Sequence, residues 1–544
     1  MIRFQRLSLF LLLASSLFVS PSAAQESSPK LTERMLSDHP GLREGTYEVV
    51  REDWIAALES DPESPLAYSA AVCIARMTGQ ILEATLSADR LWALAERVPE
   101  ARASKALRIA ALSAFQEKRF AQPETQPPAE AFPDHVKHFA VLGALGPYDR
   151  GAVLRHEPAL DVRTLQPLPG SLVGQDAEWR ALERPGLAWN VEPERLIYPR
   201  GSGEGWLLAL IKTQPGQARI RVESMISFQA WWNGERALNE MRTSWADLGY
   251  DVDVDVEALE GWNALLIRFV GGAEPDFGVQ VLDSSGRRVS HESFDFESLE
   301  NDWTRLPALA QNEGRTLTRV PFEINRQLDS SSPWSKALSV AMDGYGRRSD
   351  RALSREVPSD EDPAAAAFWR ARHIAVRQAI HLPGEVYRRL QLEAEAALDR
   401  LGVTFPEIEL ARIERNLEEE LVTESVTEAR ELVESYPNCA ELRYLIATAL
   451  DYLDATGTLG TLERKRILQD RPRDVSGWLQ VANRAFDAGD IATGIATQRR
   501  ILELDGERTD TLSSLIERLS LGTEAQVQEA YLNLFKTLVD EYPA

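Results

Sequence analysis

The first long stretch of the chain places its apolar residues with the spacing of an α-helix. From about Leu31 to Phe120 the sequence consists mainly of Ala, Leu, Glu and Arg, and apolar positions return every three or four residues. This spacing puts the apolar residues on one side of a helix. The segment AQPETQPPAEAFP, which ends at Pro133, interrupts the pattern because proline has no backbone N–H to donate. The pattern predicts a helical, repeat-like domain over residues 25–125 and a linker over 126–135.

Beyond this linker the period changes from helical to alternating. Short apolar runs such as GWLLALIKT, ARIRVESMISFQAWW and NALLIRFV are separated by residues that favour turns. Asn233-Gly234 predicts a type I′ hairpin, since both residues tolerate the positive φ angles of that turn. Several short strands without helices between them predict an antiparallel β-sandwich over residues 136–300, followed by a linker over 301–333.

The run DVDVDVEALEGW, which begins at Asp251, has two interpretations. Its alternating aspartates look like the start of a calcium loop, but such a loop needs Gly at its sixth position and Glu at its twelfth. Those positions hold Val256 and Trp262. We therefore expect a strand whose valines face the core and whose aspartates form a solvated face.

The last third of the chain is helical again and repeats itself. Tyr436-Pro437, Arg471-Pro472 and Tyr542-Pro543 end similar segments, with intervals of 35 or 36 residues once Glu507 is taken as the missing proline position. The period resembles that of tetratricopeptide repeats. Gly494 supplies the small residue that the second helix of such a pair needs for close packing. The resemblance implies a tetratricopeptide-like α-solenoid over residues 334–544.

The β region resembles a second family in the order of its segments. FAVLGALGPYDRG is followed by HEPALDV, AWWNGERAL, LEGWNALLIRF and FGVQVLDSSG. This order is similar to that of galactose-binding-like, jelly-roll modules in secreted bacterial proteins. The resemblance implies a jelly-roll sandwich and a carbohydrate ligand. The chain departs from the family pattern at VESMISFQAW, where an acidic pair often precedes the hairpin.

The N-terminus has the features of a secretory signal. Arg3 and Arg6 precede an apolar run from Leu7 to Val19, and small residues follow up to Ala24. The run is shorter than the roughly 20 residues of a membrane-spanning helix, which favours cleavage over an uncleaved anchor. We expect residues 1–24 to be a signal peptide and the mature chain to be periplasmic or extracellular, with no membrane span.

The charge and the cysteine content exclude some classes of partner. The formal net charge is −24, and such a field repels phosphate backbones, so no nucleic-acid partner is expected. Cys73 and Cys439 lie in different helical regions. We expect both to be buried as small apolar residues and not to form a disulfide framework.

A search for catalytic motifs finds no H-E-x-x-H, G-x-S-x-G, P-loop or paired CxxC in the sequence. We therefore expect no catalytic residue, no metal and no cofactor. His135 and His138 are the closest histidine pair and are expected to be solvated rather than metal ligands. The acids of NLEEEL, residues 416–421, are expected to form a solvated helix face.

Two places in the sequence are candidates for binding. Strand alternation puts Trp231 and Gln229 on the outer face of the sheet, where an indole beside polar groups can stack on a sugar; a covering domain would instead bury it. The final segment YLNLFKTLVDEYPA carries Phe535 and Leu538 on an apolar stripe. Terminal repeats usually end in a polar capping helix, so this stripe predicts a docking surface for a protein partner, a second copy of the chain or a downstream domain.

These observations predict an exported, non-enzymatic binding or scaffold protein, with helical repeats for protein partners and a sandwich for a carbohydrate. The alternative is the non-catalytic N-terminal portion, or a companion, of a transglutaminase-like or other hydrolytic enzyme, as the module order implies. A Cys, His and Asp set after the repeats would favour that alternative, and no histidine follows His381.

The small residues at Ser22 to Ala24 predict that the mature chain begins at about Gln25. N-terminal sequencing of the protein recovered from a bacterial periplasm or growth medium is expected to return this start. A sequence beginning at Met1 would contradict cleavage.

Overall fold

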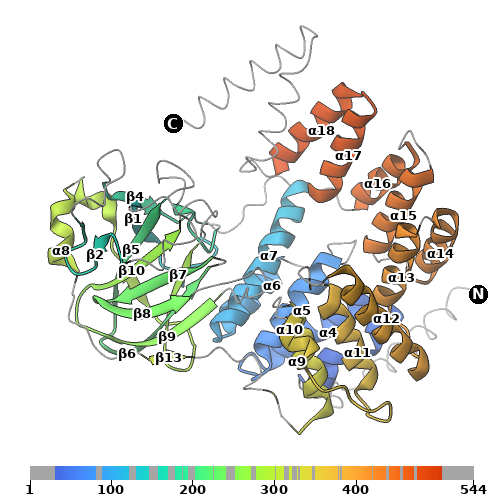
Figure 1. Cartoon of the computed structure of the whole chain (residues 1–544), viewed down its shortest axis with the longest axis horizontal. Coiled ribbons are helices and arrows are strands. Elements are labelled where there is room, and N and C mark those ends of the chain that lie inside the picture. Colours follow the sequence, from blue (N-terminus) through green and yellow to red (C-terminus); the bar gives the residue numbers. More distant parts are fainter. Residues whose placement is uncertain are drawn as a thin grey trace, which may run out of the picture.

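The computed structural model is a mixed α and β protein. Along the chain, antiparallel sheets follow an N-terminal helical region and precede a C-terminal one, and in space the sheets lie to one side of both (Figure 1). The predicted signal peptide, Cys439, Phe535 and Leu538 lie outside the described residues. The described residues are 31–80, 88–121, 130–145, 157–168, 178–184, 186, 188–193, 203–224, 226–240, 251–270, 277–300, 302–310, 318–320, 328, 331–345, 349–377, 379, 383–419, 421–436, 440–453, 458–470 and 475–504.

The N-terminal helices form where the sequence analysis expects them. Thr32 begins the first helix by accepting a hydrogen bond from the backbone N–H of Met35, a typical N-cap. Cys73 is buried as predicted. The helices are α2 (Glu33–Ser37), α3 (Pro40–Glu44), α4 (Tyr47–Ser60), α5 (Ala67–Gln80), α6 (Ala88–Arg97) and α7 (Ala101–Ala121).

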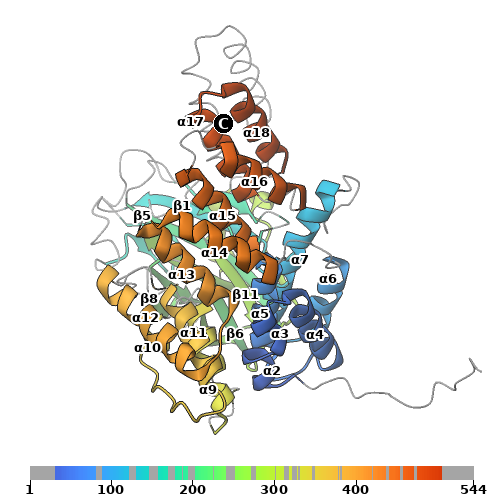
Figure 2. The ribbon, with the colours of Figure 1, turned by 90° about the vertical axis from the view of Figure 1, so that its right-hand side faces the viewer.

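The C-terminal helices pack as successive antiparallel neighbours, with α13 against α14, α15 against α16 and α17 against α18. Figure 2 shows these pairs rising one above another towards α18. The helices are α9 (Pro333–Tyr345), α10 (Ser349–Leu353), α11 (Ala365–Arg377), α12 (Gly384–Leu401), α13 (Pro406–Glu418), α14 (Val422–Ser435), α15 (Ala440–Leu453), α16 (Thr458–Asp470), α17 (Val475–Asp487) and α18 (Ile491–Leu504).

The two helical regions, expected as separate domains, share one hydrophobic core. A single cluster of buried side chains runs from α2 through α7 and continues through α9 to α15. Arg34 lies over the ring of Trp334 at 5.4 Å, which ties the first helix to α9. The β region is therefore inserted between two parts of one helical body.

The β region contains two main antiparallel sheets. The larger has the strand order β4-β1-β5-β10-β7-β8, with β12 also paired to β5, and the smaller has the order β11-β6-β9-β13. The strands are β1 (His138–Leu145), β2 (Leu160–Asp161), β3 (Gln166–Pro167), β4 (Arg180–Glu183), β5 (Glu204–Thr213), β6 (Gly216–Glu223), β7 (Phe228–Trp232), β8 (Glu235–Glu240), β9 (Asp251–Ala258), β10 (Asn263–Val270), β11 (Gly278–Leu282), β12 (His291–Ser293) and β13 (Thr318–Val320).

The two sheets enclose a core made of alternate residues from each strand, including Ile220, Trp232 and Val254. The predicted hairpin joins β7 to β8, and Asn233 and Gly234 both have positive φ angles, of 49° and 82°. Strand formation by the DVDVDV run is confirmed, because β9 pairs along its whole length with β6.

Parts of both predicted linkers belong to the folded structure. In the first, Ala131 and Phe132 are buried, and His135 forms a β-bridge with Gln280. In the second, β13 pairs with β9. Residues distant in the sequence hold these short segments, so the local spacing of residues could not predict that they are ordered.

The expectation of a solvated aspartate face on β9 is wrong. Helix α7 lies beside the smaller sheet, between the sandwich and the other helices (Figure 1), and its Arg102 binds both Asp251 and Asp253. Asp253 is only 2% exposed. The alternating pattern correctly separated the two faces, but it could not reveal that a distant helix covers the polar one.

The charges on this face are arranged so that each acid has a cation nearby. Within the sheet, Arg221 donates to Asp253 through Nε at 2.8 Å. Burial raises the pKa of Asp253, but the nearby Arg221 and Arg102 outweigh that effect and hold the pKa below its ordinary range. Glu223 lies opposite Asp251, and like charges in that position repel. Lys105 of α7 binds Glu223 and relieves that repulsion.

His135 is part of the same interface and is not solvated as expected. Its side chain is fully buried, and Nε2 lies 3.3 Å from the Glu223 carboxylate. Burial lowers the pKa of His135. The histidine therefore serves the junction between the sandwich and α7, and no metal role is needed to explain its place.

We predict that Asp253→Ala destabilises the protein by roughly 3–5 kcal/mol, because it leaves the buried Arg221 without its main counter-ion. Asp255→Ala on the same strand is the matched control. Its pair with Arg219 is 37% exposed on the aspartate side, so its loss should cost less than about 1 kcal/mol. Urea denaturation of both variants tests the difference, and equal losses would contradict a buried charge network.

Candidate functional site

Trp231, the candidate for sugar stacking, lies on the outer face of the larger sheet as strand alternation predicts. Its side chain is only 6% exposed, and its ring centroid lies 5.3 Å from that of Trp206. The cover is an apolar cluster from the β2–β3 hairpin and the segment Phe296–Ala310. Trp231 is therefore buried, as in the alternative interpretation, although the residues that cover it do not belong to a helical domain.

Gln229, the second candidate on this face, takes part in a buried polar network. Its side-chain oxygen accepts a hydrogen bond from Arg268 Nη1 at 3.0 Å, and its amide donates to Asn239 at 3.0 Å. Arg268 also pairs with Glu204, and both of these side chains are 1% exposed. These contacts orient Gln229 within the fold and leave it little surface to offer a ligand.

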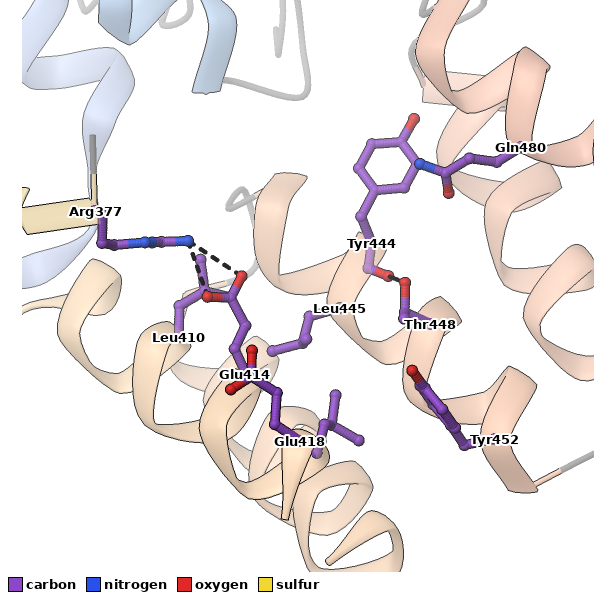
Figure 3. A pocket seen from close by; sticks show the side chains of 10 residues that line it. Arg377, Leu410, Glu414, Glu418, Tyr444, Leu445, Thr448, Tyr452 and Gln480 are labelled. Atoms are coloured by element: carbon purple, nitrogen blue, oxygen red, sulfur yellow. Dashed lines mark hydrogen bonds and ion pairs between the residues drawn. The ribbon is translucent and has the colours of Figure 1, made fainter. Parts of the chain in front are cut away.

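A hollow lies on the C-terminal helices (Figure 3). Its volume is about 580 Å³. Three of the four helices that line it are the first members of successive pairs, α13, α15 and α17, and the fourth is α11. We call it the helical groove. Its lining residues are Arg377, Leu410, Glu414, Leu417, Glu418, Tyr444, Leu445, Thr448, Tyr452 and Gln480.

One wall of the groove, α13, is held in place by ion pairs with its neighbouring helices. Arg415 of α13 donates two hydrogen bonds to Glu395 of α12, at 2.8 and 2.7 Å. Nearer the start of α13, Arg370 of α11 pairs with Glu407. These contacts to α12 and α11 fix the orientation of α13, and with it the orientation of the residues that face the groove.

The other walls approach closely because glycine lies at the contact points. A methyl group on Gly477 of α17 would clash with the Tyr444 hydroxyl of α15, and one on Gly494 of α18 would lie 2.6 Å from the ring of Phe486. The packing role predicted for Gly494 is therefore confirmed. The contact at Gly477 brings α17 near enough to α15 for Gln480 to reach the groove.

The lining of the groove combines an apolar floor with a few polar groups. Leu410, Leu417 and Leu445 are buried and form the floor. Arg377 donates to both oxygens of Glu414, at 3.1 and 2.9 Å, and so neutralises that carboxylate (Figure 3).

Two exposed groups of the groove stand apart from this pair. Tyr452 is 68% exposed, and Glu418 is also exposed. In the described part of the chain, neither the carboxylate of Glu418 nor the hydroxyl of Tyr452 has a hydrogen-bond or ion-pair partner. The groove is thus able to hold a ligand with both apolar and polar groups.

The residue pattern of the sequence does not predict this site. The expected solvated face at Glu418 agrees with the exposure of that residue but does not include its position at the groove. A weak signal was present, because Tyr444, Thr448 and Tyr452 follow one another at intervals of four residues and so share a helix face. Such spacing cannot distinguish a groove from an ordinary solvent-facing surface.

Comparisons and wider searches give no family or cofactor to attach to this groove. No protein-family model matches the chain, and no curated protein sequence matches it. In the described ranges, no three His, Cys, Asp or Glu side chains come together as a metal site requires. Nor does any helix there have the length and apolar character needed to cross a membrane.

The ion pairs between α13 and its neighbouring helices predict a pH-dependent contribution to stability. Burial raises the pKa of Glu395, but the adjacent His373 and Arg415 outweigh it, and the pKa falls from an ordinary 4.5 to about 2. A carboxyl group whose pKa is lower in the folded than in the unfolded protein stabilises the fold at pH values above its unfolded-state pKa. That stabilisation is lost as the pH falls towards its folded-state pKa. The shift corresponds to about 3 kcal/mol at neutral pH.

We therefore expect Glu395→Gln to lower the free energy of unfolding at pH 7. The difference in the free energy of unfolding between this variant and the native protein should become smaller by roughly 1 kcal/mol or more when the pH falls to about 3.5. Glu393→Gln, on the exposed side of the same helix, is the control and should change stability by less than about 0.5 kcal/mol. Urea denaturation across this pH range provides the measurement, and a difference that stays constant would rule out the proposed role of Glu395.

Proposed function

We propose that the chain is an exported, non-enzymatic binding or scaffold protein that holds an extended segment of a partner protein in the helical groove. The observation that carries this proposal is the lining of the groove by α13, α15 and α17, the first helices of successive pairs. A surface built in this way from neighbouring pairs is concave and continuous, which suits an extended polypeptide.

The proposal includes a tetratricopeptide-like arrangement of the C-terminal helices. It is supported by the antiparallel pairing and by the ends of α14, α16 and α18 at Ser435, Asp470 and Leu504, close to the period of that repeat. We also propose that the sandwich is a jelly roll, and its two antiparallel sheets support this assignment.

The carbohydrate part of the expected function receives less support than the protein-binding part. Trp231 and Gln229, the two residues that suggested it, are each 6% exposed and take part in internal packing. The outer faces of both main sheets also carry covering segments, α7 on one and Phe296–Ala310 on the other. The proposed function therefore rests on the groove.

A matched pair of substitutions tests whether the groove binds polypeptides. Thr448 of α15 and Thr427 of α14 each donate a side-chain hydrogen bond to the carbonyl four residues earlier, but only Thr448 lines the groove. Thr448→Trp would fill the groove, whereas Thr427→Trp adds the same ring to an exposed position. Peptides selected from a random displayed library on the native chain provide the ligands.

We expect Thr448→Trp to weaken binding of the selected peptides at least about tenfold, and Thr427→Trp to change it less than about twofold. Fluorescence anisotropy measures both affinities, and urea denaturation checks that both variants are folded. A library that yields no binding peptide, or peptides that bind both variants equally well, would reject the groove as the binding site.

A further inference from the structure

The charges of the groove are unevenly compensated. Glu414 is held by Arg377 within the groove, and Glu419, just outside it, pairs with Arg388. Glu418 lies between these two acids in the sequence, faces the groove and has no ion-pair partner among the described residues. Of the charged residues that line the groove, Glu418 is therefore the one whose charge is left for a ligand.

The surroundings of Glu418 suit a long cationic side chain. In Figure 3, Leu445 lies between Glu418 on α13 and Tyr452 on α15, and the floor below is built from leucines. Lys and Arg place an alkyl stem on apolar surface while their charged end stays near water. The ring of Tyr452, on the other side of Leu445 in this view, adds further apolar surface for the stem.

Building on the proposed function, we propose that the partner segment inserts a lysine or arginine side chain into the helical groove, with its cation at Glu418 and its stem on Leu445 and Tyr452. The net charge of −24 supports the same choice, because a negative protein attracts cationic segments and speeds their association. The partner is thus a basic, extended stretch of another exported protein.

Two synthetic peptides test this inference on the full chain. One carries two lysines and two leucines spaced by glycine and serine, and the other has glutamine in place of each lysine. Glu418→Gln removes the proposed contact, and Glu419→Gln makes the same change at the neighbouring position, which does not line the groove. Both acids are exposed, so neither variant should affect folding.

We expect the lysine peptide to bind the native chain more tightly than the glutamine peptide, and Glu418→Gln to weaken the lysine peptide roughly fivefold. Glu419→Gln should leave its affinity within about twofold, and Glu418→Lys should reverse the preference in favour of a glutamate version of the peptide. Equal binding of the lysine and glutamine peptides, or equal effects at the two positions, would overturn the inference.

The outcomes separate this inference from the proposed function. If library peptides bind in a manner sensitive to Thr448→Trp but carry no basic residue, the groove binds polypeptides and the cationic preference is wrong. If Thr448→Trp affects no peptide, the proposed function itself fails. Sedimentation of the chain alone provides a further check, because a dimer disrupted by Thr448→Trp would assign the groove to a second copy and contradict a basic partner.

Discussion

The ion pairs between α7 and the outer face of the smaller sheet determine how the rest of the molecule is arranged. Alternation along β9 sends valines into the sandwich and aspartates outward, and the register with β6 sets Glu223 opposite Asp251. Two acids at such a position repel each other, and Arg102 and Lys105 of α7 supply the compensating charge. Because Arg221 and Asp253 are nearly inaccessible to water, the contact also depends on accurate geometry. The sandwich is therefore fixed to the helical region by paired charges.

Helix α7 also connects this charged interface to the hydrophobic core of the helical regions. Leu107 and Ala111 of α7 belong to the core that holds α4 and α5, and this core continues into α9, α11 and α13. A sequence of packed elements thus joins the acidic strand to the wall of the groove. The chain leaves the helical body after α7, forms the sandwich and returns at α9. This path explains why the two helical regions, although far apart in the sequence, share buried residues.

The sequence predicted local features well and long-range contacts poorly. The hairpin at Asn233, the strand at Asp251 and the close packing at Gly494 follow from backbone and spacing rules that act over a few residues. The burial of His135 and the cover over Trp231 depend on segments remote in the sequence, and no local period reports them. The helical groove could not be predicted from the sequence for the same reason. Its residues come from four helices, and each helix alone looks like an ordinary amphipathic one.

The walls of the groove differ in how firmly they are held, and this difference bears on how it would bind. Leu410 and Leu445 belong to the main core, whereas Ile467 of α16 lies in a separate small cluster. The core thus ends near α15, and Gln480 lies beyond it. In stacked helical pairs, stability comes largely from each pair and its nearest neighbours. A ligand that contacts both α13 and α17 would therefore connect the wall that packs on the main core to the wall that lies beyond it. Binding and ordering of the outer pair would then be coupled, since a ligand favours the arrangement to which it binds more tightly.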